Sequence, residues 1–215
     1  MKRILSLVCV AMFTLCASAQ VTFNVKLGGG LAFNSISESG VSTKADNKSL
    51  FVGKLGFGME LPVSQNFSIM PSLELALKGG KLESDGDVSK INTTYLQLPV
   101  MAAYRFPLTD RLNMTLKAGP YFAYGLSGKC KNQDDDGDSD ESNIFSDKDM
   151  GGKAASRFEI GGIAGVDFEY HRFVVGAEFE YGFTDFYKVS YQEENYSYSG
   201  KMKNMAAYIT VGYKF

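Results

Sequence analysis

The sequence predicts an all-β protein, an eight-stranded antiparallel up-and-down β-barrel that crosses a membrane, with short periplasmic turns and long extracellular loops. Three observations predict it. Apolar and polar residues alternate with period 2 through eight segments, the connections between these segments alternate between long and short, and the first residues are typical of a secretory signal. Apart from residues 1–19, no stretch reaches the roughly 18 consecutive apolar residues of a transmembrane helix.

The N-terminal segment predicts export and removal. Lys2 and Arg3 precede an apolar run over 4–15, and Ala17-Ser18-Ala19 is an A-x-A cleavage site, so we expect a signal peptide over 1–19 and a barrel domain over 20–215. Cys16 could instead accept a lipid, but a bulky residue precedes it. Cleavage leaves Cys130 as the one cysteine of the mature chain, which excludes a disulfide within that chain.

The clearest strand pair lies in Phe158–Phe183. Apolar residues occupy even positions before His171 and odd positions after Arg172, as expected for two antiparallel strands joined by a two-residue turn. The same alternation predicts eight strands, over 21–34, 50–61, 67–77, 93–106, 112–126, 158–170, 173–183 and 204–215.

The connections predict which strand ends share a side of the membrane. Long polar loops are expected over 35–49, 79–92, 128–156 and 185–203, and short turns over 62–66, 107–111 and 171–172. In an antiparallel meander all long loops then lie at one end, as in outer-membrane barrels. Prolines inside strands remove a ladder donor, so we predict β-bulges at Pro71, Pro99 and Pro120.

Two features indicate that the apolar rows face lipid, whereas a soluble lipocalin-like barrel would bury them. The charged rows are rich in glycine, which suits the crowded inner face of a narrow barrel: Gly28, Gly30, Gly56, Gly58, Gly161, Gly165, Gly176 and Gly182. The aromatic residues of the apolar rows gather at the strand ends, as in interfacial girdles. They are Phe23, Phe67, Tyr104, Phe106, Phe168, Tyr170, Phe173, Tyr213 and Phe215 at one end, and Phe33, Phe51, Phe122, Tyr124, Tyr181 and Phe183 at the other.

The inward rows then carry charges of both signs in near-equal number. Buried charges must be paired or hydrated, so we expect a salt-bridged, plugged lumen without large conductance. A narrow channel for small solutes is the alternative. The predicted lumen residues are Lys26, Lys54, Lys78, Arg105, Lys117 and Arg157 with Glu60, Glu74, Glu159, Asp167, Glu169, Glu178 and Glu180.

Two loop features are candidate binding sites. One has the spacing of an EF-hand calcium loop at positions 1, 3, 5, 6 and 9, but Asn143 replaces the glutamate at position 12, so a merely solvated acidic loop is the alternative. The last loop is rich in tyrosine, which suits contact with a protein or glycan. The calcium candidates are Asn132, Asp134, Asp136, Gly137 and Asp140, and the tyrosines are Tyr187, Tyr191, Tyr196 and Tyr198.

Other function classes are disfavoured. The net charge of −2 argues against a nucleic-acid partner. The one histidine, His171, lies in a short turn, away from the external rim where a catalytic base would be needed, so we expect no enzyme activity. No sequence pattern calls for a cofactor.

Tyr95–Phe106 (YLQLPVMAAYRF) and Ala118–Leu126 (AGPYFAYGL), together with the aromatic C-terminus, resemble the PorT-like outer-membrane β-barrel family of Bacteroidetes. The resemblance implies an outer-membrane barrel. Its founding member is tied to protein secretion, and most relatives have no assigned task. The terminal VGYKF resembles the signal that the barrel-assembly machinery recognises. We therefore expect a structural, assembly or surface-recognition protein in contact with the lipid bilayer.

Overall fold

The described residues form one sheet that closes on itself. A computed structural model describes residues 21–39, 46–84, 87–133, 139–146, 155–193 and 196–215, so the predicted signal peptide lies outside the described residues. Strand β1 (Thr22–Ser39) pairs with both β3 (Leu50–Pro62) and β11 (Tyr196–Lys214), which closes the barrel. No helix in this part of the chain is both long enough and apolar enough to span a membrane.

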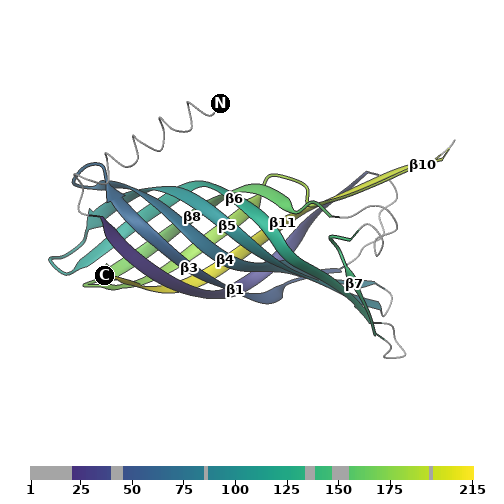
Figure 1. The fold of residues 1–215 in the computed structure, drawn as a ribbon, viewed down its shortest axis with the longest axis horizontal. Helices are drawn as coiled ribbons and strands as arrows, with labels where there is room; N and C mark the ends of the chain where they lie inside the picture. The colour runs from purple at the N-terminus through teal and green to yellow at the C-terminus, as the bar shows by residue number, and fades with distance from the viewer. Residues whose placement is uncertain (1–20, 40–45, 85–86, 134–138, 147–154, 194–195) are drawn as a thin grey trace.

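Eight strands make the wall, and each pairs antiparallel with its neighbours in sequence order (Figure 1), which confirms the predicted fold class. Between β3 and β11 the wall contains β4 (Phe67–Ser84), β5 (Asp87–Pro107), β6 (Leu112–Gln133), β8 (Phe158–Tyr170) and β9 (Phe173–Gly182). Three further strands lie beyond one end of the barrel, with β2 (Asp46–Lys48) on β4, β7 (Ser139–Asn143) on β6 and β10 (Tyr187–Glu193) on β11.

The outer connections differ from the prediction. Strands β4 and β5 stay paired as far as Ser84 and Asp87, so a loop over 79–92 is wrong, and β10 and β11 form a hairpin within the predicted loop 185–203. These extensions project past the barrel (Figure 1). Backbone pairing can continue into water, where both faces of a strand are polar. Apolar alternation therefore ends before the strand does.

The opposite end has the predicted tight turns. Strands β8 and β9 are joined by His171 and Arg172, and His171 has a φ of 55°. Positive φ at the first central residue alone is typical of a type II′ hairpin turn, and the twist of that turn matches that of the flanking strands.

The predicted bulges at the prolines are wrong. The registers on both sides of Pro71, Pro99 and Pro120 are unchanged past each proline. Each proline is paired with a residue of one neighbouring strand, whereas two residue pairs, including its own, are missing from the ladder with the other neighbouring strand. One missing donor therefore costs local pairing and leaves the register intact, while the register shift that does occur lies between Thr94 and Tyr95.

Apolar rows cover the outside of the wall. Ile209 is 63% exposed, whereas its neighbours Tyr208 and Thr210 are 2% and 3% exposed. Aromatic rings pack along the rim at the short-turn end, where Tyr213 lies 5.3 Å from Phe173 and 5.4 Å from Phe215 between ring centroids. This confirms the predicted inside-out arrangement and contradicts a soluble barrel.

Candidate functional site in the barrel lumen

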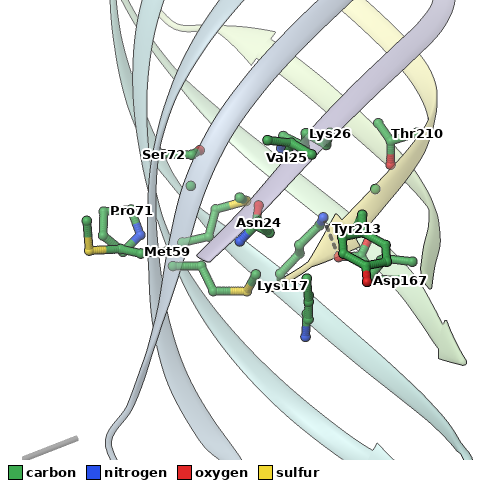
Figure 2. Close-up of a pocket in the computed structure, with 16 residues that line it drawn as sticks. Asn24, Val25, Lys26, Met59, Pro71, Ser72, Lys117, Asp167, Thr210 and Tyr213 are labelled. Atoms are coloured by element: carbon green, nitrogen blue, oxygen red, sulfur yellow. Dashed lines mark hydrogen bonds and ion pairs between the residues drawn. The ribbon is translucent and has the colours of Figure 1, made fainter. Parts of the chain in front are cut away.

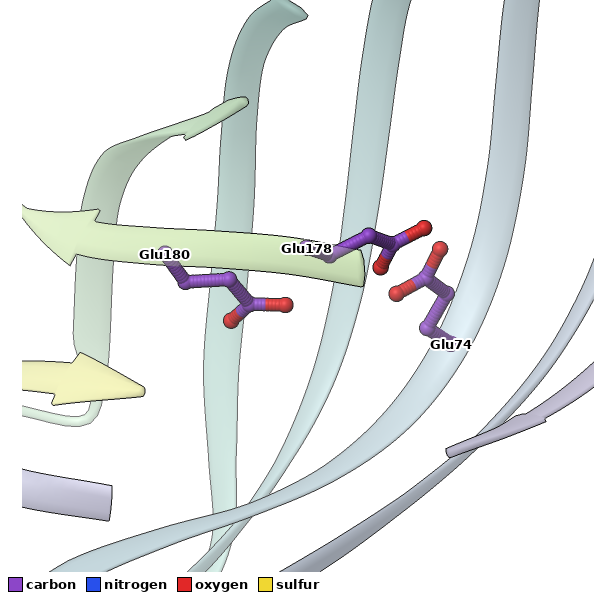
Figure 3. A group of neighbouring side chains, drawn as sticks. All are labelled: Glu74, Glu178 and Glu180. Atoms are coloured by element: carbon purple, nitrogen blue, oxygen red, sulfur yellow. The ribbon is translucent and has the colours of Figure 1, made fainter. Parts of the chain in front are cut away.

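A central cluster of buried charges is built around Lys54 of β3. Its Nζ lies 2.9 Å from Glu180 and 3.3 Å from Glu74, and it also pairs with Glu178. Figure 3 shows the three glutamates converging from β4 and β9. Their carboxylate oxygens lie within 4.8 Å of one another, close enough to share a metal ion. Lys26 also joins this cluster, and its Nζ lies 2.6 Å from Glu74 and 2.8 Å from Glu178. Lys26 and Lys54 therefore already supply the positive charge that the carboxylate oxygens need.

The cluster extends through Lys78 towards the end of the barrel that carries the β4–β5 and β10–β11 hairpins, here called the long-hairpin end. The Nζ of Lys78 lies 2.9 Å from Glu159 and 3.0 Å from Glu180. The hydroxyl of Tyr121 donates to Glu159 at 2.5 Å, and Asn204 also donates to that carboxylate. In the other direction, Lys117 pairs with Asp167 at 2.5 Å and with Glu178 at 2.7 Å.

A second cluster lies near the short turns. Arg105 pairs with Glu60 at 2.7 Å and with Glu169 at 3.4 Å, and Lys214 pairs with the same two carboxylates. Lys214 was not among the predicted lumen residues. The alternation could have identified it, because Tyr213 and Phe215 on either side face outward.

Glycine makes room for these long side chains, as predicted. A Cβ at Gly56 would lie 3.0 Å from Cγ of Glu74 and 3.2 Å from Lys26, and one at Gly176 would lie 2.0 Å from Oδ1 of Asp167. Gly30 differs, because its Cβ would lie 1.9 Å from the carbonyl oxygen of Ala207. That glycine permits a close approach of two backbones.

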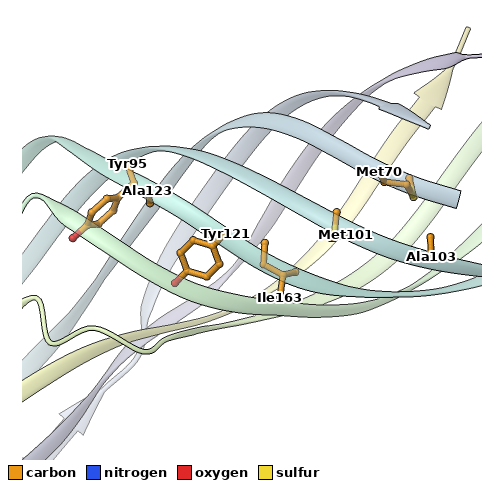
Figure 4. Packing of buried hydrophobic residues seen from close by; sticks show 7 residues of the cluster. All are labelled: Met70, Tyr95, Met101, Ala103, Tyr121, Ala123 and Ile163. Atoms are coloured by element: carbon orange, nitrogen blue, oxygen red, sulfur yellow. The ribbon is translucent and has the colours of Figure 1, made fainter. Parts of the chain in front are cut away.

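An apolar patch covers part of the inner wall (Figure 4), formed by Met70, Tyr95, Met101, Ala103, Tyr121, Ala123 and Ile163. Between the two charge clusters is a cavity of about 40 Å³, lined in part by Met59, Lys117 and Lys214 (Figure 2). Oδ1 of Asp167, which also lines it, has no hydrogen-bond partner among the described residues. A water needs about 10–15 Å³, so the cavity has room for a few waters.

An apolar cluster covers the long-hairpin end of the lumen. Ile144, Phe145, Ala155 and Phe186 are buried there, and the described fold ties this segment to the strands by hydrogen bonds from Ile144 N to Gly128 O and from Ser156 N to Phe186 O. The rings reach so close to the wall that a Cβ at Gly125 would lie 2.5 Å from Phe145.

Arg157 belongs to this outer apolar cluster rather than to the ion-pair network where we predicted it. Its guanidinium lies 4.7 Å from the Phe145 ring centre and donates to the carbonyl of Gly125. The cluster itself was missed, since two apolar residues in a long polar segment give no periodic signal.

The remaining predicted site residues lie outside the lumen network. Asn132 and Asp140 are directly opposite in the β6–β7 ladder, while Asp134, Asp136 and Gly137 lie outside the described residues. The four tyrosines are strand residues rather than loop residues, because Tyr187 and Tyr191 belong to β10 and Tyr196 and Tyr198 to β11, with Tyr191 opposite Tyr198.

Comparisons with known proteins agree with this architecture. A family model described as outer membrane protein beta-barrel domain matches residues 18–188. No curated protein sequence matches the chain.

Among solved structures, the chain is similar to Ail, the attachment invasion locus protein of Yersinia pestis, in complex with the heparin analogue sucrose octasulfate (16% identity, 90% of this chain and 99% of that one, TM-score 0.40). It is also similar to Neisserial surface protein A (12%, 90% and 97%, TM-score 0.42) and to the outer membrane enzyme PagL (10%, 85% and 97%, TM-score 0.40).

Proposed function

This chain belongs to the family of outer membrane protein beta-barrel domains, and from that premise we propose that it is a non-conducting barrel with a structural, assembly or surface-recognition role. One observation carries the proposal. Within the described residues, the lumen contains six cations and seven carboxylates, each of which has an oppositely charged partner: Lys26, Lys54, Lys78, Arg105, Lys117 and Lys214 with Glu60, Glu74, Glu159, Asp167, Glu169, Glu178 and Glu180.

Ion pairs that bridge the lumen in this way block a pore rather than line an open one. A channel selective for ions of one sign uses rings of side chains of the opposite sign, whereas here both signs are present and pair across the lumen between strands far apart in sequence, as Lys54 and Glu180 do. The outer apolar cluster lies across the long-hairpin end as a second barrier to a polar solute.

A narrow channel is the second candidate, and the cavity between the two charge clusters favours it. Liposome swelling in an isotonic small sugar, together with planar-bilayer recording, separates the two functions. We expect no swelling above that of protein-free liposomes and no stable current steps, with a general porin as positive control. Sugar uptake or large, reproducible single-channel currents would contradict the proposal.

We also propose that the protein is not an enzyme. The geometry of the candidate groups supports this, because His171 lies in the turn between β8 and β9 at the end opposite to the outer apolar cluster. The lumen carboxylates with the greatest burial, such as Glu74 and Glu180, are held by lysines, as in a structural network.

For a surface-recognition role we propose the β10–β11 hairpin, with its four tyrosines, as the contact for a protein or glycan, because loops and hairpins on a rigid scaffold commonly carry function. Crosslinking in intact cells, with Y191A/Y198A as the comparison, tests this. Three further hypotheses remain part of the proposal. They are calcium binding near Asn132, a link to secretion through the PorT-like resemblance, and recognition of the C-terminal strand by the barrel-assembly machinery.

A further inference from the structure

Four lysines stand side by side across the extension of the barrel wall. Lys48 of β2 is opposite Lys81 of β4, Lys81 is opposite Lys90 of β5, and Lys90 is opposite Lys131 of β6. Residues directly opposite in antiparallel strands share one face of the sheet, so the four side chains form a single row. Lys129, two residues before Lys131, lies on the same face.

This lysine row continues the lipid-facing surface. In β4 the outward residues are Leu73, Leu75 and Leu77, and the same alternation leads to Lys81 four residues later. At about 3.3 Å per residue and a tilt of about 40°, Lys81 lies on the order of 10 Å beyond Leu77 along the membrane normal. The headgroup layer is roughly 5–8 Å thick on each side, so the backbone of the row lies a few ångströms outside it, and long lysine side chains can reach back to the headgroups.

The polarity of the two sheet faces is reversed at the level of the lysine row. On the membrane side of the row, the outward face of the sheet is apolar and the inward face is charged. At the row itself, the inward side chains Ile91 and Cys130 pack against the outer apolar cluster, while the outward positions carry lysine. In the backbone register, Glu141 of β7 is opposite Lys131 at the sheet edge, and Asp46 is opposite Glu83, two residues beyond Lys48 and Lys81. The positive charge is therefore nearest the lipid.

We propose that the row Lys48–Lys81–Lys90–Lys131, with Lys129, binds the phosphate groups of outer-leaflet lipid headgroups. Neighbouring ammonium groups in one row can contact the same phosphate from more than one strand. The lysine ammonium is a compact, strongly hydrated charge suited to phosphate. Continuity with the lipid-exposed rows identifies a lipid rather than a soluble polyanion as the occupant.

Native mass spectrometry of the detergent-refolded full chain tests this assignment. The probes are lipid A with two phosphates, the same lipid after dephosphorylation, phosphatidylcholine, and soluble inorganic polyphosphate. The variant K90Q/K131Q removes two charges from the row. The control R111Q/R172Q removes two charges from the short turns at the other end, where both arginines are exposed.

Lipid A is expected to bind more tightly than its dephosphorylated form. Near an anionic surface each lysine contributes about fivefold, so K90Q/K131Q should weaken lipid A binding by on the order of 20-fold and R111Q/R172Q by less than about twofold. Equal binding of the two lipid A forms, or equal losses in both variants, would overturn the proposal. So would polyphosphate binding that depends on the row when lipid A binding does not. Unchanged heat-modifiability on SDS gels verifies that each variant is folded.

Discussion

Replacement of Lys54 by methionine is expected to lower the free energy of unfolding by about 3–5 kcal/mol, the usual cost of breaking a buried ion pair by removing one partner. Lys54 is 3% exposed and pairs with Glu74, Glu178 and Glu180. Methionine fills similar space but leaves three carboxylates close together without the cation between them. Urea unfolding in phosphatidylcholine vesicles, followed by circular dichroism, measures the loss.

Two further variants show whether charge balance is the cause. K54M/E180Q removes one carboxylate together with the lysine, and we expect a favourable coupling of about 0.5–3 kcal/mol relative to the two single changes. Lys201 lies exposed on the external part of β11, so K201M should change stability by less than about 0.5 kcal/mol. A K54M protein as stable as K201M would mean that the lumen network does not hold the barrel together.

Arginine at Ile209 is expected to cost about 2–4 kcal/mol, the range for a cation at the bilayer midplane on the lipid face of a barrel. Ile209 is opposite Ala177 of β9, halfway between the rims, and is 63% exposed on the outside. The same substitution at Phe215, which is 62% exposed at the rim, should cost only about 0–1 kcal/mol because an interfacial arginine reaches water.

The comparison of these two sites isolates depth in the membrane from exposure, since both side chains are equally exposed. Folding yield into vesicles and urea midpoints measure it. An I209R protein that folds as well as F215R would exclude a hydrocarbon environment around the middle of β11.

The sequence predicts the membrane-spanning part of this fold well because each strand there has one lipid-facing and one lumen-facing side. That contrast made Ile209 and Lys54 assignable by position alone. The sequence of the hairpins beyond the membrane lacks that contrast, so alternation could not predict the pairing of Ser84 with Asp87 or the β10–β11 hairpin.

The lumen residues could be assigned, but their partners could not. Alternation places Lys54 and Glu180 on the inner face, whereas their 2.9 Å contact depends on barrel closure and strand tilt, which bring β3 opposite β9. The burial of Phe145 against Gly125 depends on how a long connection folds back, and no local pattern encodes that.

Tryptophan fluorescence tests most directly whether apolar rows meet lipid while the adjacent rows fill the lumen. The chain has no tryptophan, so each of I209W and Y208W places a single reporter on neighbouring, opposite faces of β11. In vesicles of brominated phosphatidylcholine, strong quenching of I209W and little quenching of Y208W are expected. Equal quenching of both, or quenching of I209W by aqueous iodide instead of brominated lipid, would contradict the account.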